Sequence, residues 1–394
     1  AAIESYKKAL KIQPDYAEIH HNMGVSLQVK GEVGAAVSSH KQALKIKPDL
    51  VEAANYLAKL PSEYIGREEL NLLQENFNNQ VSNKENHVTL KFLAANILRH
   101  KGDVKGAFNK FSDANRAKAE SIRKFILEEQ LHNNCYLEKL KNWTPNPEPN
   151  KLGVLKKLFI LGPSRSGKTS LETLLSKSRK VKPLGESIKL SRFSEDNGNA
   201  PYQKIDFNEI FYHDELTLKM EGFEVVLCTS PNAISVAMEI FDRSTDCYFI
   251  FLKRDQRAVA SEIFTTNYTS KNFYSYDPTA LTDYLQFYDQ ASQLIQSKVQ
   301  GRALDLSFEE VVGDPHQIIK KISTFLSIDF GINKNRIKKL KFTEKKEYHN
   351  YFCNLSQFNS QAFTSSAGNI TSKKGPYQYI EIIKKFYRKL LDAN

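Results

Sequence analysis

The N-terminal part of the chain repeats a pattern of small, aromatic and proline positions with a period of 34 residues. Four positions of the first unit recur one period later, Ala2, Tyr6, Ala9 and Pro14 becoming Ala36, His40, Ala43 and Pro48. Small residues at this period are typical of paired helices that approach closely, and the proline ends the second helix of each pair. The pattern predicts helical hairpins. Because it begins inside a hairpin, we expect further repeats before Ala1.

A weaker copy of the pattern follows at Gly102, Ala107, Phe111 and Ala114, which predicts one more hairpin. Helical spacing of apolar residues continues over 118–141. Three prolines then fall within 145–149, where neither a helix nor a central strand tolerates them. The predicted domain ranges are therefore 1–60 for the repeats, 61–142 for a helical segment with a degenerate hairpin, 143–151 for a proline-rich linker, and 152–394 for a second domain.

Beyond the linker, short apolar runs alternate with helical patterns. The expected strands are Lys157–Leu161, Phe223–Cys228, Cys247–Leu252 and Ala303–Leu306. The expected helices lie at about 168–178, 256–264, 279–297, 315–326 and 377–391. Such alternation predicts an α/β domain with a parallel sheet that is covered by helices on both faces.

Composition places the chain among globular proteins, with 41% hydrophobic and 26% charged residues in a length of 394. These values exclude collagen-like and wholly disordered classes. The formal net charge of +11 is concentrated in two regions: 151–190 has 10 basic and 2 acidic residues, and 334–394 has 13 and 4. We therefore expect an anionic ligand or partner near these two regions.

The apolar runs are too short to cross a bilayer, so no membrane span is expected. The cysteines lie far apart and form no metal-ligand pattern, at Cys135, Cys228, Cys247 and Cys353. We therefore expect a reducing compartment, the cytoplasm, and no structural metal. No nucleic-acid-binding motif is present, so no nucleic-acid partner is expected.

A phosphate-binding motif follows the first expected strand. Gly162, Gly167, Lys168 and Thr169 satisfy the pattern G-x4-G-K-S/T and are followed by a helical pattern. Such a loop directs backbone N–H groups at phosphate oxygens at the start of a helix. Lys168 and Thr169 leave an ATP- or GTP-dependent kinase or ATPase open as an alternative.

A nucleotide triphosphatase should also have a strand that ends in a carboxylate for Mg²⁺. The later strands instead run into Thr229 and into Lys253 and Arg254, and Asp305 lies inside its strand. The strand ends therefore offer cations where a magnesium site would need carboxylates.

Five segments point to a known family: "LKFLAANILRHKGDVKGAFNKFSDANRAK", "FILGPSRSGKTSLETLL", "PLGES", "FIFLKRDQRAVAS" and "LSFEEVVGDPHQIIKKISTFLSI". Together they resemble the sulfotransferases that use 3′-phosphoadenosine 5′-phosphosulfate, in particular a bacterial branch with tetratricopeptide (TPR) repeats related to tyrosyl-protein sulfotransferases. The resemblance covers nearly the whole chain. It implies a three-layer α/β/α sulfotransferase domain after the repeats, this donor as co-substrate, and no metal.

The implied reaction is transfer of the sulfuryl group to a hydroxyl of a protein, tyrosine-like, or of a glycan acceptor that docks on the repeats. Arg165 and Lys168 are the expected catalytic cations on the 5′ side. The other donor-binding residues implied by the resemblance are Ser166, Gly167, Thr169 and Ser170 in the loop, Arg254 and Ser261 at the 3′-phosphate, and Lys373 and Lys374 in a basic C-terminal segment.

Glu186 is the first choice for the catalytic base, because the family has a Gly-Glu at this place and a carboxylate can accept the acceptor's proton. His213 is the second choice. The relatives have a second Glu where this chain has Ser187, and a Lys where it has Thr229. Arg254 and Ser261 are seven residues apart instead of eight. These departures leave a catalytically weakened TPR binding protein as a further alternative.

Overall fold

The computed structural model describes residues 2–80, 87–147, 155–186, 215–243, 245–268, 272–332 and 337. Residue contacts divide the chain into two compact units. The first contains the described parts of 1–126 and 264–280, and the second contains the described parts of 127–263 and 281–342. The domain ranges expected from the sequence stay a prediction.

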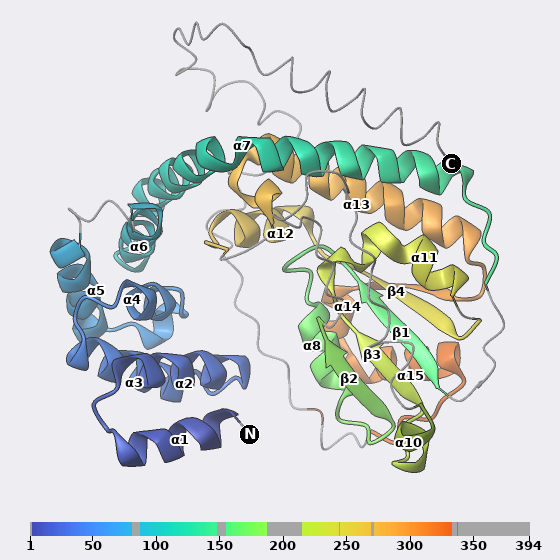
Figure 1. Ribbon diagram of the computed structural model, residues 1–394, viewed down its shortest axis with the longest axis horizontal. Coiled ribbons are helices and arrows are strands. Elements are labelled where there is room, and N and C mark those ends of the chain that lie inside the picture. Colours follow the sequence, from blue (N-terminus) through green and yellow to red (C-terminus); the bar gives the residue numbers. More distant parts are fainter. Residues whose placement is uncertain are drawn as a thin grey trace, which may run out of the picture. The chain divides into compact units, whose positions relative to one another are not determined.

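The first unit is built of helical pairs, as the 34-residue period predicts (Figure 1). Its helices are α1 (Ala2–Ile12), α2 (Ala17–Val29), α3 (Val33–Ile46), α4 (Val51–Ala58), α5 (Arg67–Gln80) and α6 (His87–His100), with short 3₁₀ turns η1 (Ser62–Tyr64) and η3 (Phe273–Tyr276). Helix α7 (Val104–Asn142) begins in this unit and continues into the second, with a kink at Ile122.

The repeat positions form the contacts between these helices. Ala36 and Ala43 of α3 are completely buried, so their small side chains set the spacing of the pairs. His40 is also completely buried, and a Cβ atom on Gly24 would lie 2.7 Å from its ring carbon Cε1. The His40 ring lies beside His21, with 3.4 Å between the two Nδ1 atoms. Burial, with a contribution from His21, lowers the pKa of His40 to about 3.

We predict that acid destabilises the first unit through His40. The pKa of His40 is 6.5 in the unfolded chain and about 3 in the folded unit. Between these two pH values the unfolded chain binds a proton at His40 and the folded unit does not. The free energy of unfolding should therefore fall by up to about 1.4 kcal/mol per pH unit as the pH drops through this window. Thermal denaturation at several pH values tests this. His40→Gln should reduce the slope, whereas the exposed-site control His87→Gln should keep it. An unchanged slope in His40→Gln would contradict the prediction.

The second unit contains a five-stranded, wholly parallel sheet in the order β2-β3-β1-β4-β5. Its strands are β1 (Lys156–Leu161), β2 (Val181–Gly185), β3 (Val225–Cys228), β4 (Cys247–Lys253) and β5 (Ala303–Ser307). Four of these were expected from apolar runs. The expectation missed β2, because Lys182 and Pro183 interrupt its apolar pattern and it lies at an edge of the sheet, where a proline is tolerated.

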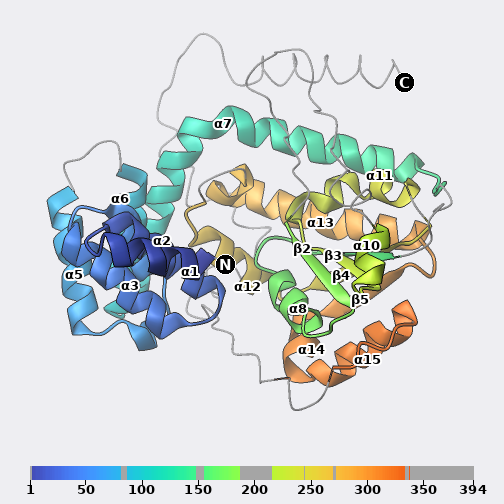
Figure 2. The same ribbon diagram turned by 60° about the horizontal axis from the view of Figure 1, so that its bottom comes forward.

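Helices cover both faces of this sheet, which confirms the predicted three-layer arrangement (Figure 2). The helices of this part of the chain are α8 (Lys168–Leu175), α10 (Glu215–Met220), α11 (Ala237–Asp242) after the 3₁₀ turn η2 (Pro231–Val236), α12 (Gln256–Phe264), α13 (Pro278–Lys298), α14 (Phe308–Gly313) and α15 (Pro315–Leu326). The helix expected at 377–391 lies outside the described residues.

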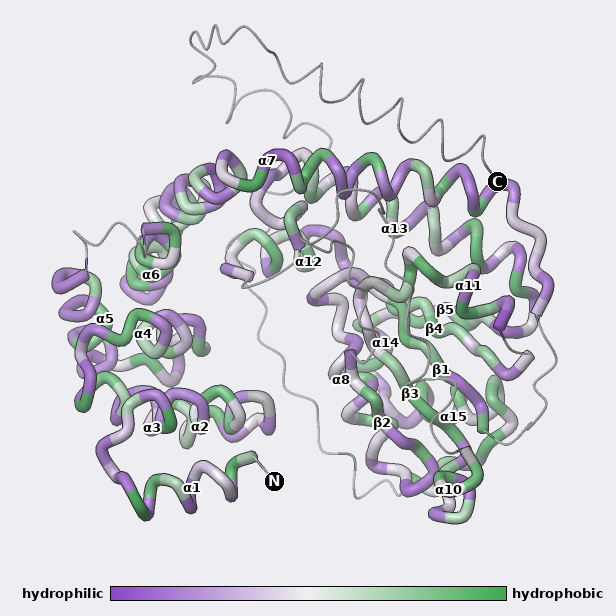
Figure 3. Tube along the Cα trace, in the orientation of Figure 1, coloured by the Kyte–Doolittle hydropathy of each residue, from purple (hydrophilic) through white to green (hydrophobic). Residues whose placement is uncertain are grey.

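The alternation of side chains along the central strands builds two cores. Leu158 and Ile160 of β1 pack with α8, α14 and α15 on one face. Phe159 points the other way and packs against Phe249 of β4, which stacks on Phe241 of α11. Both faces of the central strands are therefore apolar. Figure 3 shows the corresponding hydrophobic residues as green stretches along these strands. This double burial is the reason for their continuous apolar runs.

Candidate active site

The phosphate motif forms the turn between β1 and α8, at the carboxyl edge of the sheet. Two glycines make this turn possible. A Cβ on Gly162 would lie 2.8 Å from the carbonyl oxygen of Leu252, and Gly167 has a left-handed φ of +97°. A Cβ on Gly167 would also lie 2.2 Å from Cδ2 of Phe308. The loop therefore packs too closely against β4 and α14 to accept a side chain at either position.

Other contacts hold the loop in an anion-binding shape. The Gly162 N–H donates to the buried hydroxyl of Tyr288 on α13, at 2.6 Å. Ser166 is completely buried, and its hydroxyl has no hydrogen-bond partner among the residues that the structure describes. Helix α8 begins at Lys168, so the N–H groups of its first turn lie at the loop. A buried, unsatisfied hydroxyl beside a helix N-terminus fits a ligand phosphate or sulfate oxygen.

Lys168 lies inside this loop. Its buried Nζ donates to the carbonyl oxygens of Gly162 at 2.7 Å and Pro163 at 2.9 Å. Burial lowers the pKa of Lys168 to about 8, the charge of Glu186 opposes this, and that of Arg165 adds to it. Lys168 is thus a cation at neutral pH that the loop holds ready with its own carbonyl groups.

The loop also meets the end of β4. Nη1 of Arg254 donates to the Arg165 carbonyl oxygen at 2.7 Å, and Arg165 adopts a left-handed φ of +67°. The Arg254 guanidinium carbon lies 4.6 Å from the ring centre of Phe308, the ring that packs on Gly167. The structure therefore brings the expected 5′ and 3′ cations together at one edge of the sheet.

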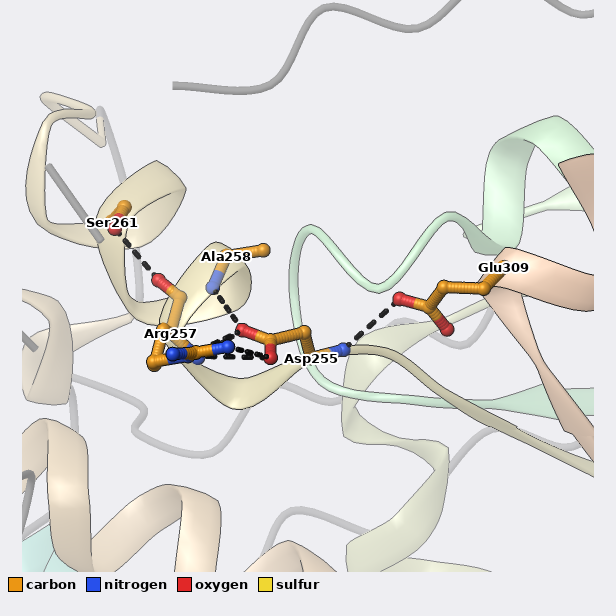
Figure 4. A network of polar contacts seen from close by, with 5 residues as sticks. All are labelled: Asp255, Arg257, Ala258, Ser261 and Glu309. Atoms are coloured by element: carbon orange, nitrogen blue, oxygen red, sulfur yellow. Dashed lines mark hydrogen bonds and ion pairs between the residues drawn. The ribbon is translucent and has the colours of Figure 1, made fainter. Parts of the chain in front are cut away.

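The start of α12 is organised by Asp255 rather than by Ser261 (Figure 4). The Asp255 carboxylate caps the helix by accepting from the N–H groups of Arg257 and Ala258, at 2.9 and 3.0 Å. The same carboxylate forms an ion pair with the Arg257 side chain. The backbone N–H of Asp255 donates to the Glu309 carboxylate. Ser261 is completely buried and its hydroxyl donates to the Arg257 carbonyl oxygen at 2.6 Å. Its predicted role at the 3′-phosphate stays a prediction.

Lys253, the neighbour of Arg254, pairs with Asp305 of β5 at 3.1 Å. Asp305 thus lies inside β5, as expected, and its carboxylate forms an ion pair with Lys253. A cavity of about 200 Å³ opens beside this pair, between the ends of β1 and β4 and helices α12 and α13. Arg254, Gln256 and Asp289 line its polar side, and burial raises the pKa of Asp289.

The sequence did not single out Glu172 of α8, yet it makes the central polar contacts on the other side of the loop. One carboxylate oxygen accepts from the Gly185 N–H at 3.0 Å and the other from the Thr229 hydroxyl at 3.3 Å. Burial raises the pKa of Glu172, these hydrogen bonds lower it, and the charge of Glu186 raises it. One feature of the sequence could have pointed to Glu172: it is a carboxylate that lies between the apolar residues Leu171 and Leu174 of α8.

Glu186 is exposed and directly follows Gly185, the last residue of β2. It acts electrostatically on both Lys168 and Glu172, so the structure places the expected base at the loop. Ser187, His213, Lys373 and Lys374 lie outside the described residues.

Within the described ranges, no group of three or more His, Cys, Asp or Glu side chains is arranged to hold a metal ion. No helix there is long and apolar enough to cross a membrane.

Two family models match the chain. Residues 157–331 match the sulfotransferase family, and residues 1–31 match the TPR repeat. The first range contains the phosphate loop, Glu186 and Arg254, and the second contains helices α1 and α2. Residues 157–331 are thus similar to sulfotransferases and residues 1–31 to a TPR repeat, and the first match supports a transferase activity.

Solved structures with some similarity are also sulfotransferase domains. One is from the Synechococcus PCC 7002 olefin synthase, with 18% identity over 47% of this chain and 75% of that chain and a TM-score of 0.32. Another is a sulfotransferase from Alicyclobacillus acidocaldarius, with 15% identity over 53% and 92% of the two chains and a TM-score of 0.33. No curated protein sequence matches this chain significantly.

We predict that Gly167→Ala distorts the loop. The added Cβ would meet Phe308 and would sit at a left-handed φ, so we expect a loss of about 1–3 kcal/mol in stability and at least tenfold weaker binding of adenosine 3′,5′-bisphosphate. Denaturant unfolding and calorimetry measure the two effects. Gly301→Ala is the matched control, because Gly301 has a φ of +73° and no atom near its Cβ position. Equal effects of the two substitutions on binding would contradict the prediction.

Proposed function

We propose that this chain transfers the sulfuryl group of 3′-phosphoadenosine 5′-phosphosulfate to a hydroxyl of a protein, tyrosine-like, or of a glycan acceptor. The family match supports the reaction class, and the site supports the donor. The observation that carries the proposal is the hydrogen bond between Arg254 and the Arg165 carbonyl. This hydrogen bond brings Arg254, at the end of β4, next to the phosphate loop. The donor carries one phosphate group at its 5′ position and another at its 3′ position, so it needs cations at two neighbouring places.

The residues divide the work by charge. Lys168 and Arg165 neutralise the 5′-phosphosulfate, with Ser166, Thr169 and Ser170 and the loop N–H groups as hydrogen-bond donors. Arg254 binds the 3′-phosphate, and Ser261, Lys373 and Lys374 are proposed as its further contacts. Glu186 takes the proton from the acceptor hydroxyl. Cations placed in advance stabilise the charge that develops on the leaving bisphosphate, so positioning and electrostatics supply the rate.

In the transfer step, the acceptor oxygen forms a bond to sulfur while the bond between sulfur and the bridging phosphate oxygen breaks. The electron pair of the broken bond stays on the bisphosphate, which leaves with the added negative charge. The acceptor proton goes to a carboxylate oxygen of Glu186. Atoms and charge balance without a further reactant, so the proposal needs no metal ion.

The partner and the compartment belong to the same proposal. The repeats suit a protein acceptor, because stacked helical hairpins present an extended surface to protein partners. Within the described part of the chain, Cys135, Cys228 and Cys247 form no disulfide, and a reducing compartment such as the cytoplasm is therefore part of the proposal.

The donor assignment predicts which nucleotide binds. Adenosine 3′,5′-bisphosphate should bind in EDTA, and Arg254→Ala should weaken it at least tenfold, because charge-assisted hydrogen bonds to the 3′-phosphate are lost. Calorimetry with the full chain measures this, and Lys219→Ala on α10 is a matched loss of one exposed charge. ATP that binds more tightly, and only with Mg²⁺, would instead assign the loop to a kinase or ATPase.

Lys168 predicts a pH dependence of this binding. Its pKa in the free protein is about 8, and only the protonated form attracts the anion. Affinity for the bisphosphate should fall about tenfold between pH 7 and pH 9, a range in which the ligand phosphates, with a second pKa of about 6, stay ionised. Lys168→Met should bind more weakly and lose this dependence. The same fall with pH in Lys168→Met would show that another group titrates.

A further inference from the structure

Glu172 joins three elements of the sheet domain at one point. It belongs to α8, and its two carboxylate oxygens accept from the Gly185 N–H of β2 and from the Thr229 hydroxyl just after β3. The Thr229 N–H in turn donates to the Gly185 carbonyl oxygen at 3.0 Å. Thr229 is buried and Glu172 is partly buried. The three residues form a closed ring of hydrogen bonds behind the phosphate loop.

This ring is needed because β2 ends irregularly. The pairing of β2 with β3 shifts register between Pro183 and Gly185, and Gly185 adopts a left-handed φ of +60°. Regular strand pairing therefore does not determine where the following residue, Glu186, is placed. The Glu172 carboxylate supplies the missing constraint, because one of its oxygens accepts from the Gly185 N–H while the other accepts from the Thr229 hydroxyl. Hydrogen bonds to an ionised group are the stronger ones.

We propose that Glu172 is a positioning residue, which holds the ends of β2 and β3 together and thereby sets the place of Glu186 beside Lys168. This inference rests on the proposed function, in which Glu186 accepts the acceptor's proton. Glu172 takes no proton in that step and touches neither donor nor acceptor. It acts through the backbone of Gly185, and Thr229 is its second anchor.

The chemistry explains why a glutamate serves here. Glutamine could still accept from Gly185 through its amide oxygen, but its NH₂ group would have to donate to Thr229. Aspartate is one methylene shorter, so its carboxylate would not reach both the Gly185 N–H and the Thr229 hydroxyl. Alanine removes both contacts and leaves the Gly185 N–H and the Thr229 hydroxyl without their acceptor. Glu172→Gln should therefore retain most of the positioning, and Glu172→Ala should lose it.

Kinetic measurements on variants of the full chain test whether Glu172 acts on catalysis through Glu186. With an acidic tyrosine-containing peptide as acceptor, Glu172→Ala should lower kcat at least tenfold and Thr229→Val several-fold, while the KM for the donor changes less than twofold. Glu172→Gln should recover most of the loss. Thr173→Ala, on the same helix and exposed, is the control and should behave as wild type.

The decisive comparison is with Glu186→Gln. If Glu172 acts through Glu186, adding Glu172→Ala to Glu186→Gln should cost no further activity. An additional loss of the same size in that background, or a loss of bisphosphate affinity that matches the loss of kcat, would overturn the proposal.

Hydrogen exchange tests the same proposal without catalysis. The Gly185 amide should exchange at least tenfold faster in Glu172→Ala than in wild type, should stay protected in Glu172→Gln, and should be unchanged in Thr173→Ala. A Gly185 amide that exchanges at the wild-type rate in Glu172→Ala would refute the positioning role, whatever the activity. Faster exchange in a chain that transfers no sulfate would leave the positioning role standing and reject the proposed function.

Discussion

The parallel alignment of five strands around β1 determines where everything else in the second unit can lie. Phe159 and Leu161 of β1 pair with Cys228 of β3 and Phe251 of β4, so the neighbouring strands end at nearly the same level. Parallel strands place all their following turns at one edge. The phosphate loop, Gly185, Thr229 and Arg254 meet there although they come from four separate parts of the sequence. An antiparallel partner for β1 would have sent one of these segments to the opposite edge.

This edge gathers positive charge before any ligand arrives. Arg165 and Lys168 belong to one short loop, and Arg254 reaches the same loop from the next strand. The carbonyl groups of Gly162 and Pro163 accept from Lys168 and that of Arg165 accepts from Arg254, which partly offsets the repulsion between these two cations. The carbonyls fix the cations without neutralising them. An anionic ligand would therefore find its counter-charges already oriented, which is the arrangement that makes charge stabilisation effective.

Much of the fold could be predicted from the sequence, because periodicity reports burial directly. The 34-residue period gave helical pairs, and continuous apolar runs gave the four strands that are buried on both faces. Strand β2 escaped because Pro183 and Gly185 break its pattern. The phosphate loop could be predicted because its glycines and Lys168 are adjacent in sequence. Glu172 could not, since its contacts depend on a β-bulge and on a hydroxyl 57 residues away.

Ser261 shows a different limit of the sequence. It follows Arg254 by seven residues where the family motif has eight, and no sequence pattern shows whether a serine hydroxyl turns outward or toward its own helix. In this structure it donates to the Arg257 carbonyl. Local hydrogen bonding of serine to the preceding turn competes with ligand contacts, and only the three-dimensional environment decides between them.

The contact between Gly167 and Phe308 also bears on how the protein comes to be folded. Phe308 is held in place by β5 and by the capping box of Ser307 and Glu310 at the start of α14. It lies 141 residues after the glycine that it covers. During synthesis the phosphate loop emerges long before this ring, so for that time nothing packs over Gly167. Contacts this distant in sequence form late and slow the folding of a domain. An N-terminal fragment that contains the whole phosphate motif would therefore lack the wall that gives the motif its shape.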